Sequence, residues 1–318
     1  MPHATGPARG KGRAVLRKSG NEASFSELSY SYPLKLLSPQ GASDAPVAIA
    51  YMMSYGGGLV SGDQVELDVD VGAGTSLLLL TQGSTKVFKS RQSAYLTPPL
   101  SPTLDGKAPS PEDKETRTAA TTQKINFTIS PDALLLLLPD PVTCFRDSSY
   151  SQLQTFHLEP GASAAILDWF TSGRMSRGEQ WDFERYRSAN EVFLDGKRIM
   201  RDVMLLESAP PDASLLFLPP RTLKDRLGPY ACYATLLLVG PKVQDLIASL
   251  EKAYQSIHVF QQSEPLPLVW SMSALEESSG AVVRVAALET DMVRTWLRQS
   301  LQGLSDLVGD FVYEKAFV

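Results

Sequence analysis

The feature that most constrains the fold is a unit that occurs three times, in which an alternating segment leads through a short turn into an apolar run. The turns follow Val71, Ile129 and Leu158, and the runs behind them read LLLLTQGS, LLLLPDP and AAILDWF. A polar insertion of roughly 30 residues between the first two copies leaves a period of about 29 residues. We therefore expect strand–turn–strand units that stack, each burying the apolar face of its neighbour.

The segments around these turns read as strands. VELDVDV (Val65–Val71) and INFTI (Ile125–Ile129) alternate apolar and polar residues with period two, as half-buried strands do. Asp195 and Gly196 lie between two apolar-rich segments of Glu191–Glu207, and this dipeptide favours the tight turn of a β-hairpin. Strands should therefore dominate the chain.

Helical periodicity is found only near the carboxyl end. Val243–Ile257 places Leu246, Leu250 and Tyr254 on one stripe, and Leu288–Leu304 has a similar apolar stripe. We therefore predict a mostly β fold with two α-helices toward the C-terminal part.

Two segments lack the composition of a folded core. MPHATGPARGKGRAVLRKSGN contains arginine and lysine but no acid, and Arg91–Thr122 is dominated by proline, serine, threonine and charge. Neither can bury enough apolar surface to offset its ordering entropy. We expect a disordered basic tail over residues 1–22 and a disordered insertion over residues 91–122, within a single domain of residues 23–318.

The composition excludes several classes of protein. The formal net charge is -5, with 30 basic and 35 acidic residues, which argues against a dedicated nucleic-acid binder. Two cysteines cannot make a disulfide framework and fit the reduced thiols of a cytoplasmic protein. The apolar runs are shorter than the roughly 20 residues of a membrane helix, so we expect neither a nucleic acid nor a membrane as partner.

The block GGGLVSGD (Gly56–Asp63), followed from Gly83 by GSTKVFKS, has the small residues of a phosphate-binding loop. A P-loop has lysine after its final glycine, whereas this chain has Asp63 there. The P-loop and the dinucleotide fingerprint both lead into a helix, whereas a strand pattern follows here. The sequence excludes a nucleotide site, and a small-molecule enzyme using the Gly56–Asp63 loop stays as an alternative.

Metal-binding residues are few and scattered. Cys144, His157, Cys232 and His258 form no HxH, HExxH or CxxC motif, so they could share a metal only if folding brought them together. Otherwise the cysteines are small buried side chains and the histidines surface imidazoles. A nickel-storage protein, a further alternative, would need several tight ligands, and two internal histidines are too few.

The densest mixture of charge and aromatic residues is DWFTSGRMSRGEQWDFERYRS, from Asp168 to Ser188. Four arginines and four acidic residues lie among two tryptophans and phenylalanines in this stretch. Such a stretch is either a solvated strand face or a binding surface with aromatic anchors.

These motifs together resemble a known family. GGGLVSGDQVELDVDVGAG with LLLLTQGSTKVFKS, then LPDPVTCFRDSSYSQ, DWFTSGRMSRGEQWDF and LGPYACYATLLLVG are similar, in this order, to the signature blocks of the urease accessory protein UreD, called UreH in some bacteria. The resemblance is strong from Tyr30 to Val239. It implies a β-helix-like, largely all-β domain with two helices.

The resemblance also implies a function. Members are similar to non-enzymatic scaffolds of urease maturation, which bind apo-urease and the accessory protein UreF and help to recruit the GTPase UreG. Nickel then reaches the urease active site, so we expect transient Ni²⁺ and no tightly bound cofactor. The basic tail and the insertion indicate a eukaryotic, fungal-type member.

The resemblance points to individual residues. Ni²⁺ that passes through the protein would prefer oxygen contacts that hold it weakly, and we predict Asp63 and Glu179 as carboxylates lining its route. The alternative for Asp63 is that it caps its own tight turn. Further motif and interface candidates are Gly57, Gly58, Gly62, Thr81, Gln82, Gly83, Ser84, Lys86, Arg174, Arg177 and Trp181.

Overall fold

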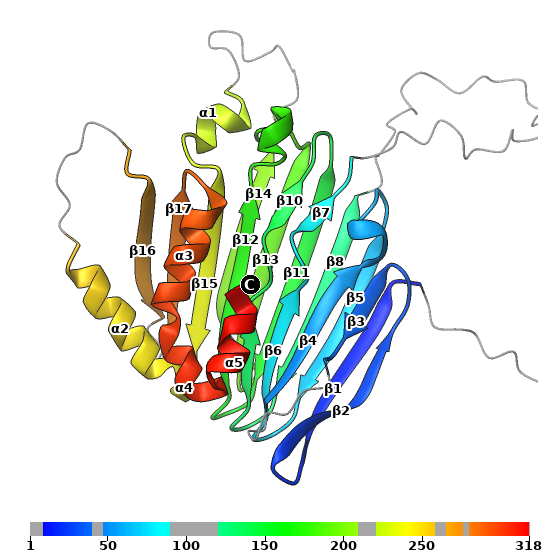
Figure 1. Cartoon of the computed structure of the whole chain (residues 1–318), viewed down its shortest axis with the longest axis vertical. Coiled ribbons are helices and arrows are strands. Elements are labelled where there is room, and N and C mark those ends of the chain that lie inside the picture. Colours follow the sequence, from blue (N-terminus) through cyan, green and yellow to red (C-terminus); the bar gives the residue numbers. More distant parts are fainter. Residues whose placement is uncertain are drawn as a thin grey trace, which may run out of the picture.

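The computed structural model describes residues 9–39, 47–89, 120–208, 221–257, 265–275 and 280–317. Two β-sheets lie face to face, and helices cover the outer face of one of them (Figure 1). We call the seven-stranded sheet, which has no helical cover within the described residues, sheet A, and the ten-stranded sheet, which carries the helices, sheet B.

Sheet A is parallel in its middle and antiparallel at its two edges. Strand β2 pairs antiparallel with β1 at one edge, and β14 pairs antiparallel with β13 at the other. In spatial order its strands are β14 (Lys197–Glu207), β13 (Arg185–Leu194), β11 (Ser149–Leu158), β8 (Thr121–Ile129), β5 (Gln64–Val71), β1 (Lys11–Ser19) and β2 (Glu22–Tyr30).

Sheet B is also mixed. Strands β4, β6, β9 and β12 run parallel, whereas the strands that flank them pair antiparallel. The spatial order is β16 (Leu268–Leu275), β17 (Gly280–Ala287), β15 (Cys232–Val239), β12 (Ser163–Thr171), β9 (Leu134–Leu137), β6 (Ser76–Thr81), β4 (Val47–Ser54) and β3 (Leu34–Leu37), with the short strands β7 (Thr85–Val87) and β10 (Val142–Cys144) attached beside β12.

The repeated sequence unit corresponds to three consecutive strand pairs. In β5–β6, β8–β9 and β11–β12 the chain leaves sheet A, turns and enters sheet B, and successive copies pair in parallel. The prediction of a mostly β chain is confirmed. A β-helix-like stack is not confirmed for the whole fold, because antiparallel pairs at β1–β2, β13–β14 and β15–β17 interrupt the repetition.

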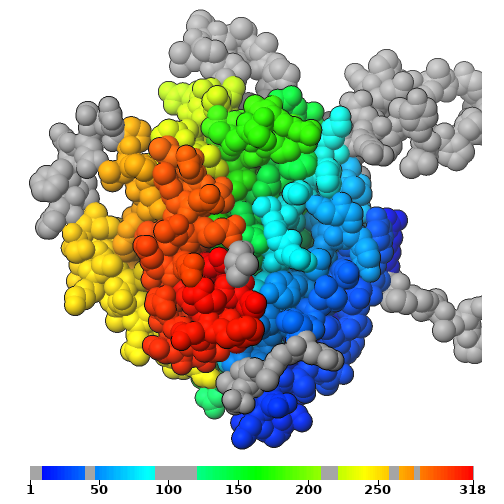
Figure 2. All heavy atoms as spheres, in the orientation of Figure 1, coloured from blue at the N-terminus to red at the C-terminus, as the bar shows by residue number. Residues whose placement is uncertain are grey.

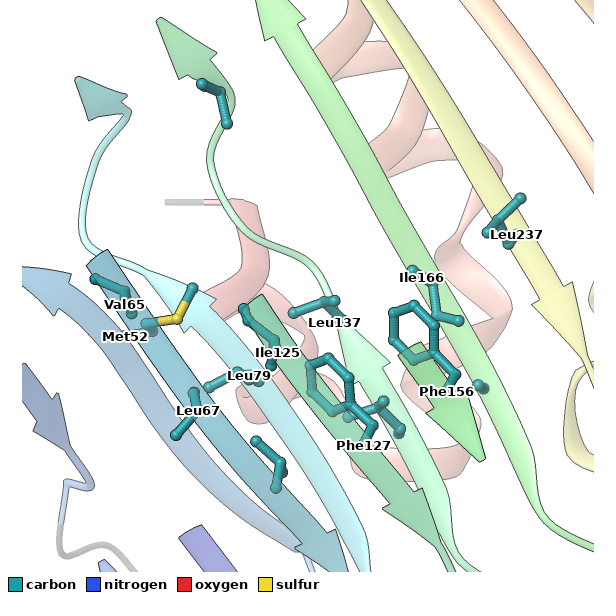
Figure 3. Close-up of a cluster of buried hydrophobic side chains, with 14 of the residues drawn as sticks. Met52, Val65, Leu67, Leu79, Ile125, Phe127, Leu137, Phe156, Ile166 and Leu237 are labelled. Atoms are coloured by element: carbon teal, nitrogen blue, oxygen red, sulfur yellow. The ribbon is translucent and has the colours of Figure 1, made fainter. Parts of the chain in front are cut away.

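The apolar runs form strands that are buried on both faces. In β6, Leu77 and Leu79 face sheet A, while Leu78 and Leu80 face the helices. This two-sided burial explains why these runs do not alternate. Between the sheets, Phe127 stacks on Phe156 with centroids 4.7 Å apart, amid the leucines and isoleucines of both sheets (Figure 3).

The described residues contain five α-helices rather than the two expected. The two predicted ones are present as α2 (Gln244–Gln255) and α3 (Thr290–Ser300). The short additional helices are α1 (Leu223–Leu227), α4 (Ser305–Val308) and α5 (Asp310–Glu314). Helices α2 to α5 pack against the outer face of sheet B, and Figure 2 shows the C-terminal ones (orange to red) as one continuous area on that face.

The expected basic tail is wrong for Lys11–Ser19. These residues form β1, which pairs with β2 and, in parallel, with β5. Strand formation is favoured here because Ala14 and Leu16 are buried between the sheets, an apolar core that the surrounding cations obscure in the sequence. Thr121 and Thr122, placed at the end of the insertion, belong to β8. Residues 1–8 and 90–119 lie outside the described residues.

Within the described part, no helix combines the length and apolarity needed to cross a membrane.

Candidate functional site

The two glycine-containing motifs lie together in one pocket of about 280 Å³. It is formed where β4 ends in the 3₁₀ turn Tyr55–Gly57 and where β6 leads into β7. Its walls include Met52, Gln123 and most of the predicted motif residues, namely Gly57, Gly58, Thr81, Gln82, Gly83, Ser84 and Lys86. Gly62 is outside this wall, with a positive φ of 81° in its own turn.

Gly58 is required for the close approach of the two motifs. The Leu59 amide donates to the Lys86 carbonyl at 2.8 Å, and a Cβ on Gly58 would lie 2.6 Å from that carbonyl oxygen. Asp140, which does not line this pocket, holds two residues that do: it accepts from the Gly83 amide at 3.0 Å, and its own amide donates to Thr81 at 2.8 Å. The pocket is therefore built on a fixed backbone.

Asp63 caps the turn in which it stands. Its carboxylate accepts from the Val60 amide at 2.9 Å, and its own amide donates to the Val60 carbonyl at 3.0 Å. The side chain is buried and is not part of the pocket wall, with the Arg9 guanidinium 4.0 Å away. This geometry favours the turn-capping alternative, and a contact with nickel stays a prediction.

Glu179 is held by arginine. Arg174 binds both carboxylate oxygens, one of them through Nε at 2.8 Å, and stacks over the Phe145 ring at 4.1 Å. The Arg174 hydrogen bonds lower the pKa of Glu179, and the Arg146 amide adds a weaker one at 3.4 Å. Glu179 thus closes its own loop, and its role as a route-lining carboxylate also stays a prediction.

Trp181 and Arg177 differ in exposure. Trp181 is buried against Phe170 and Tyr233 and offers no exposed surface in this structure, and an interface role for it stays a prediction. Its backbone is in the left-handed region, with a φ of 59°, and its ring also packs against Phe183. Arg177 is exposed on the 3₁₀ turn Met175–Arg177 and remains an interface candidate.

The three weak metal candidates that the structure describes do not converge. Cys144 faces the space between the sheets, Cys232 faces the helices, and His157 is exposed beside Phe193 on the outer face of sheet A. Burial raises the pKa of each cysteine to about 12, which keeps both thiols protonated. His258 lies outside the described residues, and no group of three potential metal ligands occurs within them.

A buried polar network begins at the pocket and crosses the interior. The inward residues of sheet A are apolar at one end of the strands, whereas those nearer the pocket are polar. Cross-strand pairing places Gln123 of β8, Gln152 of β11 and Ser188 of β13 in one row. We call the following residues the interior polar network: Gln123, Tyr150, Gln152, Asp168, Ser188 and Asn190.

The network is continuous by hydrogen bonds. Gln123 donates to the Met52 sulfur at 3.8 Å, and the Tyr150 hydroxyl lies 3.2 Å from Gln123 Oε1 and 3.0 Å from Gln152 Oε1. Gln152 in turn donates to Ser188 at 3.2 Å and approaches Asp168 at 3.5 Å. The pocket is therefore connected to a carboxylate inside the protein.

Asp168 is the acceptor on which the network ends. Ser188 and Asn190 donate to its Oδ2 at 2.5 and 2.7 Å. Burial raises the pKa of Asp168, and these hydrogen bonds offset part of the increase. Nearby, Asn190 Oδ1 and the oxygens of Gln154 and Tyr186 are buried with no hydrogen-bond partner among the described protein atoms. Such atoms suit water or a weakly held cation.

Beyond Asp168, the neighbouring row, which contains Gln154 and Asn190, reaches the far edge of the molecule. Asp202 of β14 pairs in register with Asn190, and Arg284 of β17 bonds Asp202 at 2.6 Å across the two sheets. The side chain of Arg284 is 50% exposed, whereas that of Asp202 is 19% exposed. Polar groups thus extend from the pocket to an ion pair at the opposite edge.

Sequence reasoning did not single out this network. Asp168 had a signal, because it is a charge inside the otherwise apolar run AAILDWF. Gln123, Gln152 and Asn190 had none, since a polar residue in an alternating strand is expected to face solvent.

Comparison with known proteins decides the family. A model of the family described as "UreD urease accessory protein" matches residues 8–312. The chain belongs to the UreD family. It is 39% identical to "Urease accessory protein 4" of the fungus Cryptococcus neoformans var. grubii, an alignment that covers 96% of this chain and 94% of that protein. It is 31% identical to "Urease accessory protein D" of Oryza sativa subsp. japonica over 96% of this chain and 95% of the relative.

Bacterial UreD proteins are also related. "Urease accessory protein UreD" of Sorangium cellulosum is 30% identical over 95% of this chain and 82% of its own length. The resemblance drawn from the motifs is therefore confirmed. UreD proteins are urease accessory proteins, which are chaperones rather than enzymes, so the alternative of a small-molecule enzyme does not apply.

Proposed function

We propose that this chain is a scaffold of urease maturation that binds apo-urease and UreF, helps to recruit the GTPase UreG and passes Ni²⁺ toward the urease active site. Membership of the UreD family supports the maturation role. The observation that carries the transport role is the interior polar network, which joins the pocket to Asp168.

The chemistry of the network suits a cargo that must leave again. Carboxylate, amide and hydroxyl oxygens hold a borderline cation such as Ni²⁺ less tightly than several imidazoles or thiolates would. The described residues contain a single carboxylate in the network and no group of three ligands. An ion would therefore be stabilised in passage rather than stored.

The scaffold role is tested by co-expression of this chain with its cognate apo-urease and UreF. We expect all three proteins to co-purify through a tag on any one of them. If the chain purifies alone while the other two remain soluble, the scaffold proposal is wrong.

The transport role is tested with Asp168→Asn, which removes the charge and keeps the shape of the side chain. We expect the complex to form normally and the nickel content of urease, measured by metal analysis after maturation, to fall. Asp70→Ala is the matched control, because Asp70 pairs with Arg17 on the outer face of sheet A. Equal nickel content in urease matured with wild type and with Asp168→Asn would show that Asp168 is not part of the nickel route.

The same assay separates the two roles considered for Asp63 and Glu179. If Asp63→Ala or Glu179→Ala lowers nickel content while the complex still forms, the carboxylate acts on the ion. If the complex is lost as well, the residue supports the fold or an interface, which is the outcome that the turn cap and the Arg174 pair favour.

A further inference from the structure

At the far edge of the interior, two short rows of cross-strand partners face each other. In sheet B the row runs from Asp168 of β12 through Thr235 of β15 to Arg284 of β17. In sheet A it runs from Asn190 of β13 to Asp202 of β14. Asn190 donates to Asp168 at 2.7 Å, which joins the rows at one end. Arg284 donates to Asp202 at 2.6 Å and joins them at the other. We call these five residues the edge site.

Strand alternation directs the side chains of the edge site into the space between the sheets. Ala234 and Leu236, on either side of Thr235, belong to the core under the helices, so Thr235 faces the opposite way. The neighbours of Arg284 on β17 also lie in that core. Asp202 faces inward as well, because its carboxylate accepts the Arg284 hydrogen bond across the two sheets. Side chains from four strands therefore meet at one place.

The edge site contains a buried oxygen that no protein donor reaches. Asn190 is only 1% exposed, and its Nδ2 is used by Asp168, while its Oδ1 has no hydrogen-bond partner among the described residues. The residue paired with it on β11, Gln154, has a buried Oε1 in the same condition. Buried amide oxygens without a donor are rare in folded proteins. Together with nearby carboxylates they form the oxygen-rich surroundings that divalent cations prefer.

The charges of the edge site do not balance. Burial is the main cause of the raised pKa of Asp168, and the negative charge of Asp202 raises it further, so the two carboxylates influence each other. Two ionised carboxylates against the single guanidinium of Arg284 leave one negative charge in excess. A divalent cation in place of the guanidinium would neutralise both carboxylates.

The guanidinium of Arg284 is able to leave the site. Its side chain is 50% exposed, and an ion pair of this exposure contributes little to stability. The residue paired with Arg284 on the outermost strand of sheet B is Ser271, which is exposed, so solvent lies beside the guanidinium. An arginine that turns outward regains its hydration while its aliphatic part stays on the protein.

We propose that the edge site binds a divalent cation, and that Arg284 is its internal counter-ion, which holds Asp202 until the cation takes its place. Asp168, Asp202 and the Oδ1 of Asn190 supply the oxygens, with the Thr235 hydroxyl in the same row. This proposal deepens the transport function and rests on it for the identity of the ion as Ni²⁺. It adds a last holding point inside the protein, beside strand β14.

The test measures binding of Ni²⁺ alone to the purified, untagged full-length chain by equilibrium dialysis with metal analysis. We expect Arg284→Gln to bind Ni²⁺ at least about fivefold more tightly than wild type, because the cation no longer competes with the guanidinium. Arg284→Lys keeps the positive charge and should bind more weakly than Arg284→Gln. Arg17→Gln, which breaks the ion pair with Asp70 on the outer face of sheet A, is the matched control and should bind as wild type does.

A double variant locates the ion. Asp202→Asn, added to Arg284→Gln, should abolish the gain in affinity, because it removes one of the two carboxylates. If the gain survives Asp202→Asn, the ion lies elsewhere and the proposal is wrong. It is also wrong if Arg284→Gln binds no more tightly than Arg17→Gln, including the case in which neither binds Ni²⁺. Far-ultraviolet circular dichroism that matches wild type shows that each variant is folded.

Failure of this proposal is distinguishable from failure of the transport function. If Asp168→Asn lowers the nickel content of urease but Arg284→Gln brings no gain in affinity, the route stands and the edge site is wrong. If Asp168→Asn leaves the nickel content unchanged while the gain appears and depends on Asp202, the transport function is wrong. The edge site is then a cation site whose ion is not delivered to urease.

Discussion

At Asp168 a carboxylate is kept where burial opposes its ionisation. The surrounding protein supplies Ser188 and Asn190 as donors, but the net effect of the site is to raise the pKa of this group. A partly buried carboxylate whose desolvation costs stability is expected where function needs the charge. Glu179 is the opposite case, because Arg174 lowers its pKa and makes the charged form part of the fold.

The raised pKa of Asp168 predicts a pH dependence of stability. Between the unfolded and the folded pKa the native state binds more protons than the unfolded state, so the free energy of unfolding decreases as pH rises through this window. As pH rises above 3.8, the ordinary pKa of an aspartate, the free energy of unfolding of Asp168→Asn should therefore decrease less than that of wild type. Urea unfolding at a series of pH values measures this. Parallel curves for the two proteins would show that Asp168 is not desolvated.

Between strands, the stacked pair Phe127–Phe156 joins β8 to β11 at the apolar end of the interior. Both rings are fully buried, so Phe156→Ala should lower the free energy of unfolding by about 3–5 kcal/mol. Thr128→Ala, an exposed change on the outer face of β8, should remain within about 0.5 kcal/mol. Denaturant unfolding compares the two. A loss below about 1 kcal/mol for Phe156→Ala would mean that the site collapses around the missing ring.

The strands also show how far the sequence alone predicts this protein. Alternation located β5 and β8 because one face of each is buried and the other exposed. It could not locate the polar network. In β11, written SYSQLQTFHL, Gln152 and Gln154 share the inward face with Phe156, while Leu153 faces outward. Pairing with β8 and β13 fixes this orientation, and that information is not local. The family motifs identified residues that line the pocket, but they did not predict that Trp181 is buried.

In the whole molecule, sheet B belongs to two cores at once. Leu137 contacts the core between the sheets, and its neighbour Leu136 contacts the core under the helices. A strand of sheet B that is displaced from one core is also displaced from the other. We therefore expect the helices and the two sheets to unfold as one cooperative unit. A single free energy of unfolding would then apply to the pocket, to the interior polar network and to the helices, of which α3 holds Asp140 through Arg294.

This cooperativity is tested with Leu136→Ala and Leu137→Ala, each expected to lower the free energy of unfolding by about 2–5 kcal/mol. Far-ultraviolet circular dichroism at helical wavelengths reports on the helices, mainly α2 and α3. Tryptophan fluorescence reports on Trp169, Trp270 and Trp296 on the helix side and on Trp181 on the sandwich side. Both probes should give the same midpoint in each variant, shifted together. If Leu136→Ala moves only the helical signal, the helical layer unfolds separately. Binding that depends on the pocket should in that case survive the loss of the helices, which the contact between Arg294 and Asp140 argues against.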